Sequence, residues 1–267
     1  MKPVAFTLAS AGSLSEASAL LAENPAASAI AGGQSLMPML NLRLARPSVL
    51  VPLAPIAALH GADSDGASIT IGAATTHSTI ADGACPDLSC SNLAGNILAG
   101  IAEGIAYRAV RNRGTIGGSL CHADPAADWL CTLTALDAEA LTFHPDGGRA
   151  IRLADWSTGA FRTVLRPGEI LRAVRIPRPG AAARWAYRKA CRKPGEFAHA
   201  MAAALDDPAR GTIRVAIGAL GRPPLLMEGR SIDPSHLDER LRTAGLDPVA
   251  RRMQVTILRR TLEDLRA

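Results

Sequence analysis

Residues 111–128 read RNRGTIGGSLCHADPAAD, and the fold and the function are inferred from this stretch outward. At its centre lie Gly117 and Gly118, flanked by Thr115 and Ser119. Glycine is used where a backbone adopts a positive φ or approaches another group closely. Such a pair would leave several backbone N–H groups facing one point with no side chain in the way. A concavity of this kind suits an anion, most often a phosphate.

A second stretch, residues 31–44 (AGGQSLMPMLNLRL), has the same pattern of a glycine pair near a hydroxyl, with Gly32, Gly33 and Ser35. Two glycine turns with neighbouring hydroxyls predict a diphosphate held between them. The alternative is that each glycine pair forms a plain turn, since neither stretch is a P-loop or a G-x-G-x-x-G dinucleotide motif. The residues alone therefore give a candidate diphosphate site.

The composition is that of a globular protein. The chain has 267 residues, of which 48% are hydrophobic, 20% charged and only 3% aromatic, so its core must be built mainly from Ala, Leu, Ile and Val. No apolar run approaches the ~20 residues of a membrane span, and the first residues, MKPVAFTLAS, lack the apolar core of a signal peptide. We expect a cytoplasmic protein without a membrane span.

The charge distribution and the cysteines argue against several classes of function. The net charge of +5 comes from arginines spread along the chain, without the aromatic interleaving of a nucleic-acid interface, so no nucleic acid is expected. Solvated faces, an anionic cofactor or an acidic partner subunit explain the charge. The five cysteines form no C-x-x-C and are odd in number, which predicts reduced thiols and neither a zinc site nor an iron–sulfur cluster on this chain.

Local patterns predict the elements around the two glycine turns. Ser13, followed three residues later by Glu16, predicts a helix over residues 13–22. Pro38 argues against a regular helix after the first turn, so an irregular segment is expected there. Strands are expected at residues 27–31, 48–53, 68–73, 139–143, 170–176, 183–189 and 212–220. Helices are expected at residues 76–80, 91–106, 237–244 and 247–266, the last with a possible interruption.

Two apolar segments stay ambiguous between helix and strand, residues 126–136 and residues 198–205. Pro177, Pro179 and Gly180 punctuate the chain, so the predicted domains are residues 1–177 and residues 178–267. His77 is expected to be a capping or core histidine rather than a ligand.

The two glycine stretches resemble the flavin-binding signatures of the FAD-binding medium subunit of molybdenum hydroxylases, a family that includes carbon monoxide dehydrogenase and xanthine dehydrogenase. The first signature extends to residue 53 (AGGQSLMPMLNLRLARPSVLVPL), and three downstream segments also match: RPGEILRAVRIPRP, YRKACRKPGEFAHAMAAA and RVAIGALGRPP. The resemblance implies an α+β fold: a two-subdomain FAD-binding domain of the vanillyl-alcohol oxidase and p-cresol methylhydroxylase type, followed by a smaller α+β domain.

The resemblance also implies which residues bind FAD. The first turn supplies Ala31, Gly32, Gly33, Gln34, Ser35 and Leu36, and the second supplies Thr115, Gly117, Gly118 and Ser119. Asp124 and Asp128 match acidic positions beside the ribose or adenine, and Ile105 and Leu171 match flavin-side contacts. Arg188 or Lys189 matches a basic position that could stabilise a reduced, anionic flavin.

By resemblance, the chain is the FAD subunit of a heterotrimeric molybdenum hydroxylase. Molybdopterin would lie on a large partner subunit and [2Fe–2S] clusters on a small one, and electrons would leave through FAD to an external acceptor. No residue of this chain is expected to act as an acid or base. The alternatives are a free-standing FAD oxidoreductase and a flavin-free assembly module of the same fold.

Overall fold

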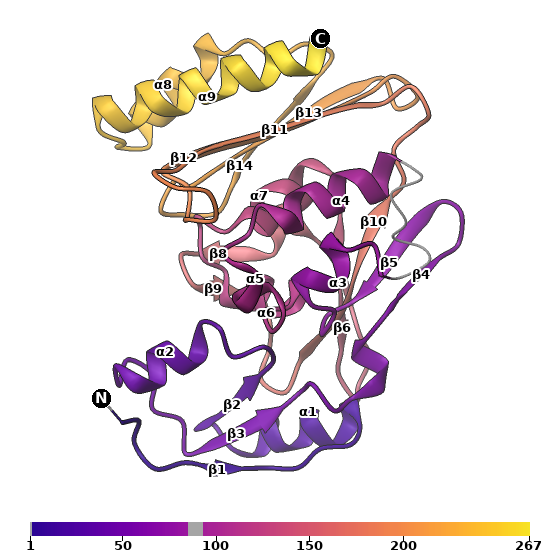
Figure 1. The fold of residues 1–267 in the computed structure, drawn as a ribbon, viewed down its shortest axis with the longest axis vertical. Coiled ribbons are helices and arrows are strands. Elements are labelled where there is room, and N and C mark those ends of the chain that lie inside the picture. The colour runs from indigo at the N-terminus through magenta and orange to yellow at the C-terminus, as the bar shows by residue number, and fades with distance from the viewer. Residues whose placement is uncertain (1, 85–92) are drawn as a thin grey trace.

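The structure, a computed structural model, describes residues 2–84 and 93–267. Three layers are stacked along the long axis of the molecule (Figure 1). A small lobe holds β1–β3, a middle lobe holds β4–β10 with α3–α7, and a third layer holds β11–β14 covered by α8 and α9. This mixed arrangement confirms the predicted α+β class.

The N-terminal lobe is a three-stranded parallel sheet in the order β1-β3-β2, with β1 at Thr7–Leu8, β2 at Ala27–Ile30 and β3 at Val49–Pro52. The helix α1 (Leu14–Glu23) begins at Ser13, whose side chain accepts a hydrogen bond from the N–H of Glu16. This cap confirms the helix start that the sequence predicts. Pro52 ends the central strand, where its missing N–H costs no ladder bond.

The middle lobe contains a five-stranded antiparallel sheet in the order β4-β5-β10-β6-β7. Its strands are β4 (Ala62–Ser64), β5 (Ser68–Gly72), β6 (Glu139–Phe143), β7 (Ala150–Arg152) and β10 (Ile170–Pro177). A short hairpin joins β8 (Ser157–Gly159) to β9 (Arg162–Thr163), and 3-10 turns lie at η1 (Ala57–Leu59) and η3 (Leu153–Asp155). The strands predicted at residues 68–73, 139–143 and 170–176 are therefore confirmed.

Five helices of the described chain belong to this lobe: α3 (His77–Ala81), α4 (Leu93–Glu103), α5 (Arg108–Arg111), α6 (Ile116–His122) and α7 (Asp128–Ala135). The start of the helix predicted at residues 91–106 lies outside the described residues. The segment 126–136, which the sequence leaves ambiguous, contains the helix α7. Every residue of α7 is buried, so no polar face reveals the helical period in the sequence.

The third layer is a four-stranded antiparallel sheet in the order β11-β12-β13-β14. Its elements are β11 (Arg184–Ala190), β12 (Ala200–Asp207), β13 (Thr212–Gly218), β14 (Leu225–Gly229), α8 (Ser235–Thr243) and α9 (Pro248–Arg266). The sheet lies between α9 on one face and α7 on the other (Figure 1). Both faces of β12 are therefore buried, which removes the alternation that would have distinguished a strand from a helix.

One prediction about the helices is wrong, and the helix predicted at residues 247–266 is confirmed. Residues 36–41 form a regular short helix, α2 (Leu36–Asn41), although Pro38 lies inside it. Pro38 is the third residue of the helix, where a backbone N–H has no intrahelical partner, so proline is tolerated there. The last helix, α9, runs from Pro248 to Arg266 without an interruption. The predicted domain boundary near residue 177 falls at the end of β10 and stays a prediction.

Candidate functional site

A cavity of about 740 Å³ lies where the three layers meet. Its wall is formed by the turn after β2, the N-terminal part of α6, the connection before α5, the turn before β10 and residues 195–197. A volume in this range suits a cofactor-sized ligand. The cavity brings together fourteen of the residues predicted to bind the cofactor: Ala31, Gly32, Gly33, Gln34, Ser35, Leu36, Ile105, Thr115, Gly117, Gly118, Ser119, Asp124, Asp128 and Leu171.

The two glycine turns are in direct contact. A Cβ on Gly32 would lie 1.9 Å from the carbonyl oxygen of Arg113 and 2.9 Å from Cα of Gly114. A Cβ on Gly118 would lie 3.6 Å from Cβ of Ala31. Gly32 is therefore required for the close approach of two backbones. It joins the N-terminal lobe to the middle lobe at the floor of the cavity.

The first turn leaves backbone donors available for a ligand. Gly33 has a φ of +72°, a conformation that L side chains adopt at a cost, and the chain then enters α2. Within the described chain, the N–H groups of Gly33, Gln34 and Ser35 make no hydrogen bond to protein. These three residues line the cavity, so their donors can serve an anionic group there.

The N–H groups of Gly117 and Gly118 are both used within the protein, which corrects the prediction that this glycine pair leaves them free. Thr115 caps α6, and its Oγ1 accepts a hydrogen bond from the N–H of Gly118 at 3.0 Å. The N–H of Gly117 donates to the carbonyl oxygen of Ala73 at 2.9 Å, and a Cβ on Gly117 would lie 2.6 Å from that oxygen. The glycine pair thus packs α6 against the end of β5. Thr115 and Ser119, which also line the cavity, carry the hydroxyl groups of this turn.

Asp128 connects the cavity wall to the third layer. It is 6% exposed, and its Oδ1 accepts hydrogen bonds from Tyr187 Oη at 2.8 Å and from Lys189 Nζ at 2.7 Å. Lys189 also donates to the carbonyl oxygen of Gly104 at 2.9 Å. Burial and the neighbouring carboxylate of Asp128 raise the pKa of Tyr187, so its phenol stays protonated and donates. Asp124 instead accepts from the N–H of Ala126 in the turn before α7.

Arg188 does not face the cavity, although it is adjacent to Lys189 in sequence. Successive side chains of a strand point to opposite faces, so in β11 Tyr187 and Lys189 face α7 while Arg188 faces α9. The guanidinium of Arg188 pairs with the carboxylate of Asp264 in α9. The geometry therefore favours Lys189, which contacts the wall residue Asp128, over Arg188, and a role of either residue toward the flavin stays a prediction.

Ile105 and Leu171 form apolar parts of the wall. Ile105 forms an isolated parallel bridge with Gly195, and the N–H of Ala106 donates to the Gly195 carbonyl at 3.1 Å. A Cβ on Gly195 would lie 2.6 Å from the Ala106 carbonyl oxygen, so glycine permits this contact between the second and third layers. Leu171 lies at the start of β10, beside a register shift in its pairing with β6.

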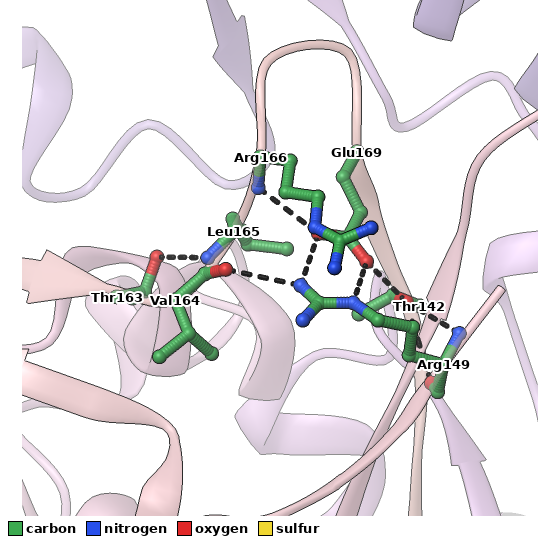
Figure 2. A network of polar contacts seen from close by, with 7 residues as sticks. All are labelled: Thr142, Arg149, Thr163, Val164, Leu165, Arg166 and Glu169. Atoms are coloured by element: carbon green, nitrogen blue, oxygen red, sulfur yellow. Dashed lines mark hydrogen bonds and ion pairs between the residues drawn. The ribbon is translucent and has the colours of Figure 1, made fainter.

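The sequence analysis missed Glu169, which lies on the cavity wall just before β10. Figure 2 shows its carboxylate at the centre of a polar network: Oε1 accepts from Arg149 Nε at 2.8 Å and from Thr142 Oγ1 at 2.6 Å, and Oε2 accepts from the N–H of Arg166 at 2.9 Å. Burial alone would raise the pKa of Glu169, but these hydrogen bonds lower it to about 2. The charged pair fixes the turn at residues 163–169 against β6 and β7.

The described residues contain no group of His, Cys, Asp and Glu side chains that could hold a metal ion. Nor does any helix in the described part of the chain have the length and apolarity to span a membrane.

Comparison with known proteins explains the cavity. Residues 4–179 match the family model described as the FAD binding domain in molybdopterin dehydrogenase. The chain belongs to this family. It is thus a flavoprotein component of an oxidoreductase, and its cofactor is FAD. The match spans both glycine turns and the turn before β10, which are the segments that line the cavity.

Relatives of known function extend the likeness beyond that domain. The chain is 34% identical to the carbon monoxide dehydrogenase medium chain of Afipia carboxidovorans over 90% of this chain and 85% of that protein. It is 32% identical to the caffeine dehydrogenase subunit beta of a Pseudomonas species, over 84% of this chain and 76% of that one. A solved structure of carbon monoxide dehydrogenase from Hydrogenophaga pseudoflava has a TM-score of 0.88 at 29% identity, covering 99% of this chain and 98% of that chain.

The residues present fit an FAD. The first turn combines available N–H donors with a glycine at positive φ, and the neighbouring helix offers two hydroxyls. Such a donor set matches the oxygen-rich diphosphate of the cofactor. The apolar side chains of Ile105 and Leu171 offer a wall for a planar ring system.

Proposed function

We propose that this chain is the FAD-binding electron-transfer subunit of a heterotrimeric, cytoplasmic molybdenum hydroxylase. Electrons would reach it from [2Fe–2S] clusters of a small partner subunit and leave to an external acceptor, while a large partner subunit would carry molybdopterin and the substrate. The observation that carries this proposal is the cavity, which joins both flavin signatures in a chain that aligns with medium chains along most of its length.

The residues of the chain would bind and orient the cofactor. The N–H groups of Gly33, Gln34 and Ser35 would hold its diphosphate. Lys189 supplies the cationic group near the wall, and its partner Asp128 keeps the ammonium at a fixed place. When bound, FAD supplies the redox chemistry, since it can take up and release electrons. No proton-transfer residue is assigned on this chain.

The experiment that tests the proposal compares the isolated chain with the assembled complex. The purified full-length chain should bind FAD, and it should hydroxylate no substrate. Adding the molybdopterin-binding and [2Fe–2S] subunits should give substrate-dependent reduction of its flavin. This reduction is measured as a change in the visible absorbance of the flavin. Rapid flavin reduction by an organic substrate with the chain alone would support a free-standing oxidoreductase instead. A chain that binds no FAD under any condition would support an assembly module.

A further inference from the structure

His77 is a buried polar residue of the cavity wall to which neither the sequence nor the comparisons assign a function. It is the first residue of α3, is 5% exposed, and donates its backbone N–H to the carbonyl oxygen of Gly114 at 2.9 Å. This bond holds α3 directly against the segment that precedes Thr115. The ring therefore belongs to the same wall as the second glycine turn.

A hydrogen bond from Trp129 determines the tautomer of the His77 ring. Nε1 of Trp129 lies 3.1 Å from Nδ1 of His77, and the indole side chain is fully buried. An indole N–H can only donate, so Nδ1 of His77 must be the acceptor. A neutral imidazole whose Nδ1 accepts carries its proton on Nε2. His77 is thus an N–H donor at Nε2.

The environment also keeps the ring neutral. Burial and the nearby positive charge of Arg111 lower the pKa of His77 to about 4. The ring therefore retains a single proton across the physiological pH range, and that proton lies on Nε2. Protonation of Nδ1 would also point its hydrogen at the N–H of Trp129 and so remove the hydrogen bond between the two rings.

Nε2 of His77 has no protein acceptor among the described residues. A Cβ on Gly114 would lie 3.0 Å from Nε2 and 2.9 Å from Cδ2, so this edge of the ring packs on a residue that has no side chain. Nε2 is not one of the fully buried polar atoms that lack a partner, so it stays accessible and can pair with an acceptor that enters the cavity. His77 lines the FAD cavity, so a molecule bound there can supply that acceptor.

We propose that Nε2 of His77 donates a hydrogen bond to an oxygen or nitrogen acceptor of the flavin nucleotide bound in this cavity. Trp129 is the positioning residue that holds the ring in the donating tautomer. The proposal rests on FAD binding by this chain and adds a donor from α3, outside both glycine turns. The small residues Ala73, Ala74 and Gly114 also line the cavity and place no polar side chain there.

The first test is the affinity of the full-length apo chain for FAD, measured by fluorescence titration. His77→Phe removes the donor and should weaken binding by roughly 5- to 100-fold, the range expected when one buried hydrogen bond is lost. His77→Gln offers an amide N–H and should recover part of that loss. A His77→Phe variant that folds normally and binds FAD as tightly as the wild type would overturn the proposal.

The second test does not depend on how well a variant folds. In the wild-type apo chain with ¹⁵N-labelled histidine, the ring assigned through His77→Gln should show an unprotonated Nδ1 and a protonated Nε2 from pH 8 to pH 5.5. Addition of FAD should shift the Nε2 proton downfield. A proton on Nδ1, or bound FAD with an unchanged Nε2 resonance, would refute the donor role alone. A wild-type chain that fails to bind FAD would instead refute the FAD site itself.

Discussion

Lys189 Nζ lies 2.7 Å from Oδ1 of Asp128, and this ion pair joins the third layer to the first residue of α7. The two side chains are only 13% and 7% exposed, and Tyr187 donates to the same carboxylate oxygen. A negative charge at the N-terminus of a helix is also favoured by the helix dipole. The side chains of Asp128, Tyr187 and Lys189, which hydrogen-bond to one another, thus fix the third layer against α7 beside the cavity.

Substitution of either charged partner should destabilise the protein and weaken FAD binding together. Asp128→Ala leaves the Lys189 ammonium buried without its counter-ion, a loss that typically costs about 3–5 kcal/mol. We expect a lower free energy of unfolding in urea and a weaker FAD complex by titration. Lys189→Met should show the same direction, and the double variant should lose less than the sum of the two.

The exposed pair of Arg108 and Asp82 provides the matched control, since these side chains are 57% and 42% exposed. Asp82→Ala should leave both the unfolding transition and the FAD affinity nearly unchanged, because solvent screens such pairs. If Asp128→Ala behaved like Asp82→Ala, the ion pair would have no role in fixing the cavity wall.

The sequence predicted the residues of the cavity well because the glycine turns are local in the chain. The resemblance to the flavin signatures and to the downstream segments implied fourteen residues that line the cavity. Lys189 and Arg188 could not be separated in this way, because the distinction depends on which face of β11 packs on α7. Strand orientation is a tertiary property that adjacent residues in a sequence do not reveal.

The physical role of Gly117 could not be predicted from the sequence either. The pair of Gly117 and Gly118 suggested free N–H groups, but the N–H of Gly117 donates to the carbonyl oxygen of Ala73, which is distant in the chain. Glu169 was missed for a similar reason, since its partner Arg149 is contributed by another part of the sheet. One available signal was the charge of Glu169 next to an apolar strand.

Gly32→Ala should separate the two glycine turns and abolish FAD binding. The new Cβ would lie 1.9 Å from a backbone carbonyl that cannot rotate away. Gly100 in α4 is the control, because a Cβ there meets nothing within 4 Å. Gly100→Ala should be neutral or stabilising by about 0.5–1 kcal/mol. Flavin content after purification and the thermal midpoint check both variants, and full FAD occupancy in Gly32→Ala would contradict the packing of the two turns.

The last prediction concerns acid stability and the pair of Arg149 and Glu169, whose Nη2 and Oε2 atoms are 2.5 Å apart (Figure 2). The pKa of Glu169 falls from its ordinary value of 4.5 to about 2 in the folded chain. A lowered carboxyl pKa stabilises the fold above pH 4.5, and this contribution is lost as the pH falls towards 2. The shift corresponds to roughly 3 kcal/mol.

Glu169→Gln should therefore lower the free energy of unfolding at pH 7 and flatten its decline between pH 4.5 and pH 2.5, measured by urea titration at each pH. Glu139→Gln removes a more exposed pair with Arg175 on the same sheet and should keep the decline. Because Glu169 also fixes the turn that carries Leu165 into the cavity wall, its variant should bind FAD more weakly at pH 7. An acid decline of full size in Glu169→Gln would show that other carboxylates dominate acid unfolding.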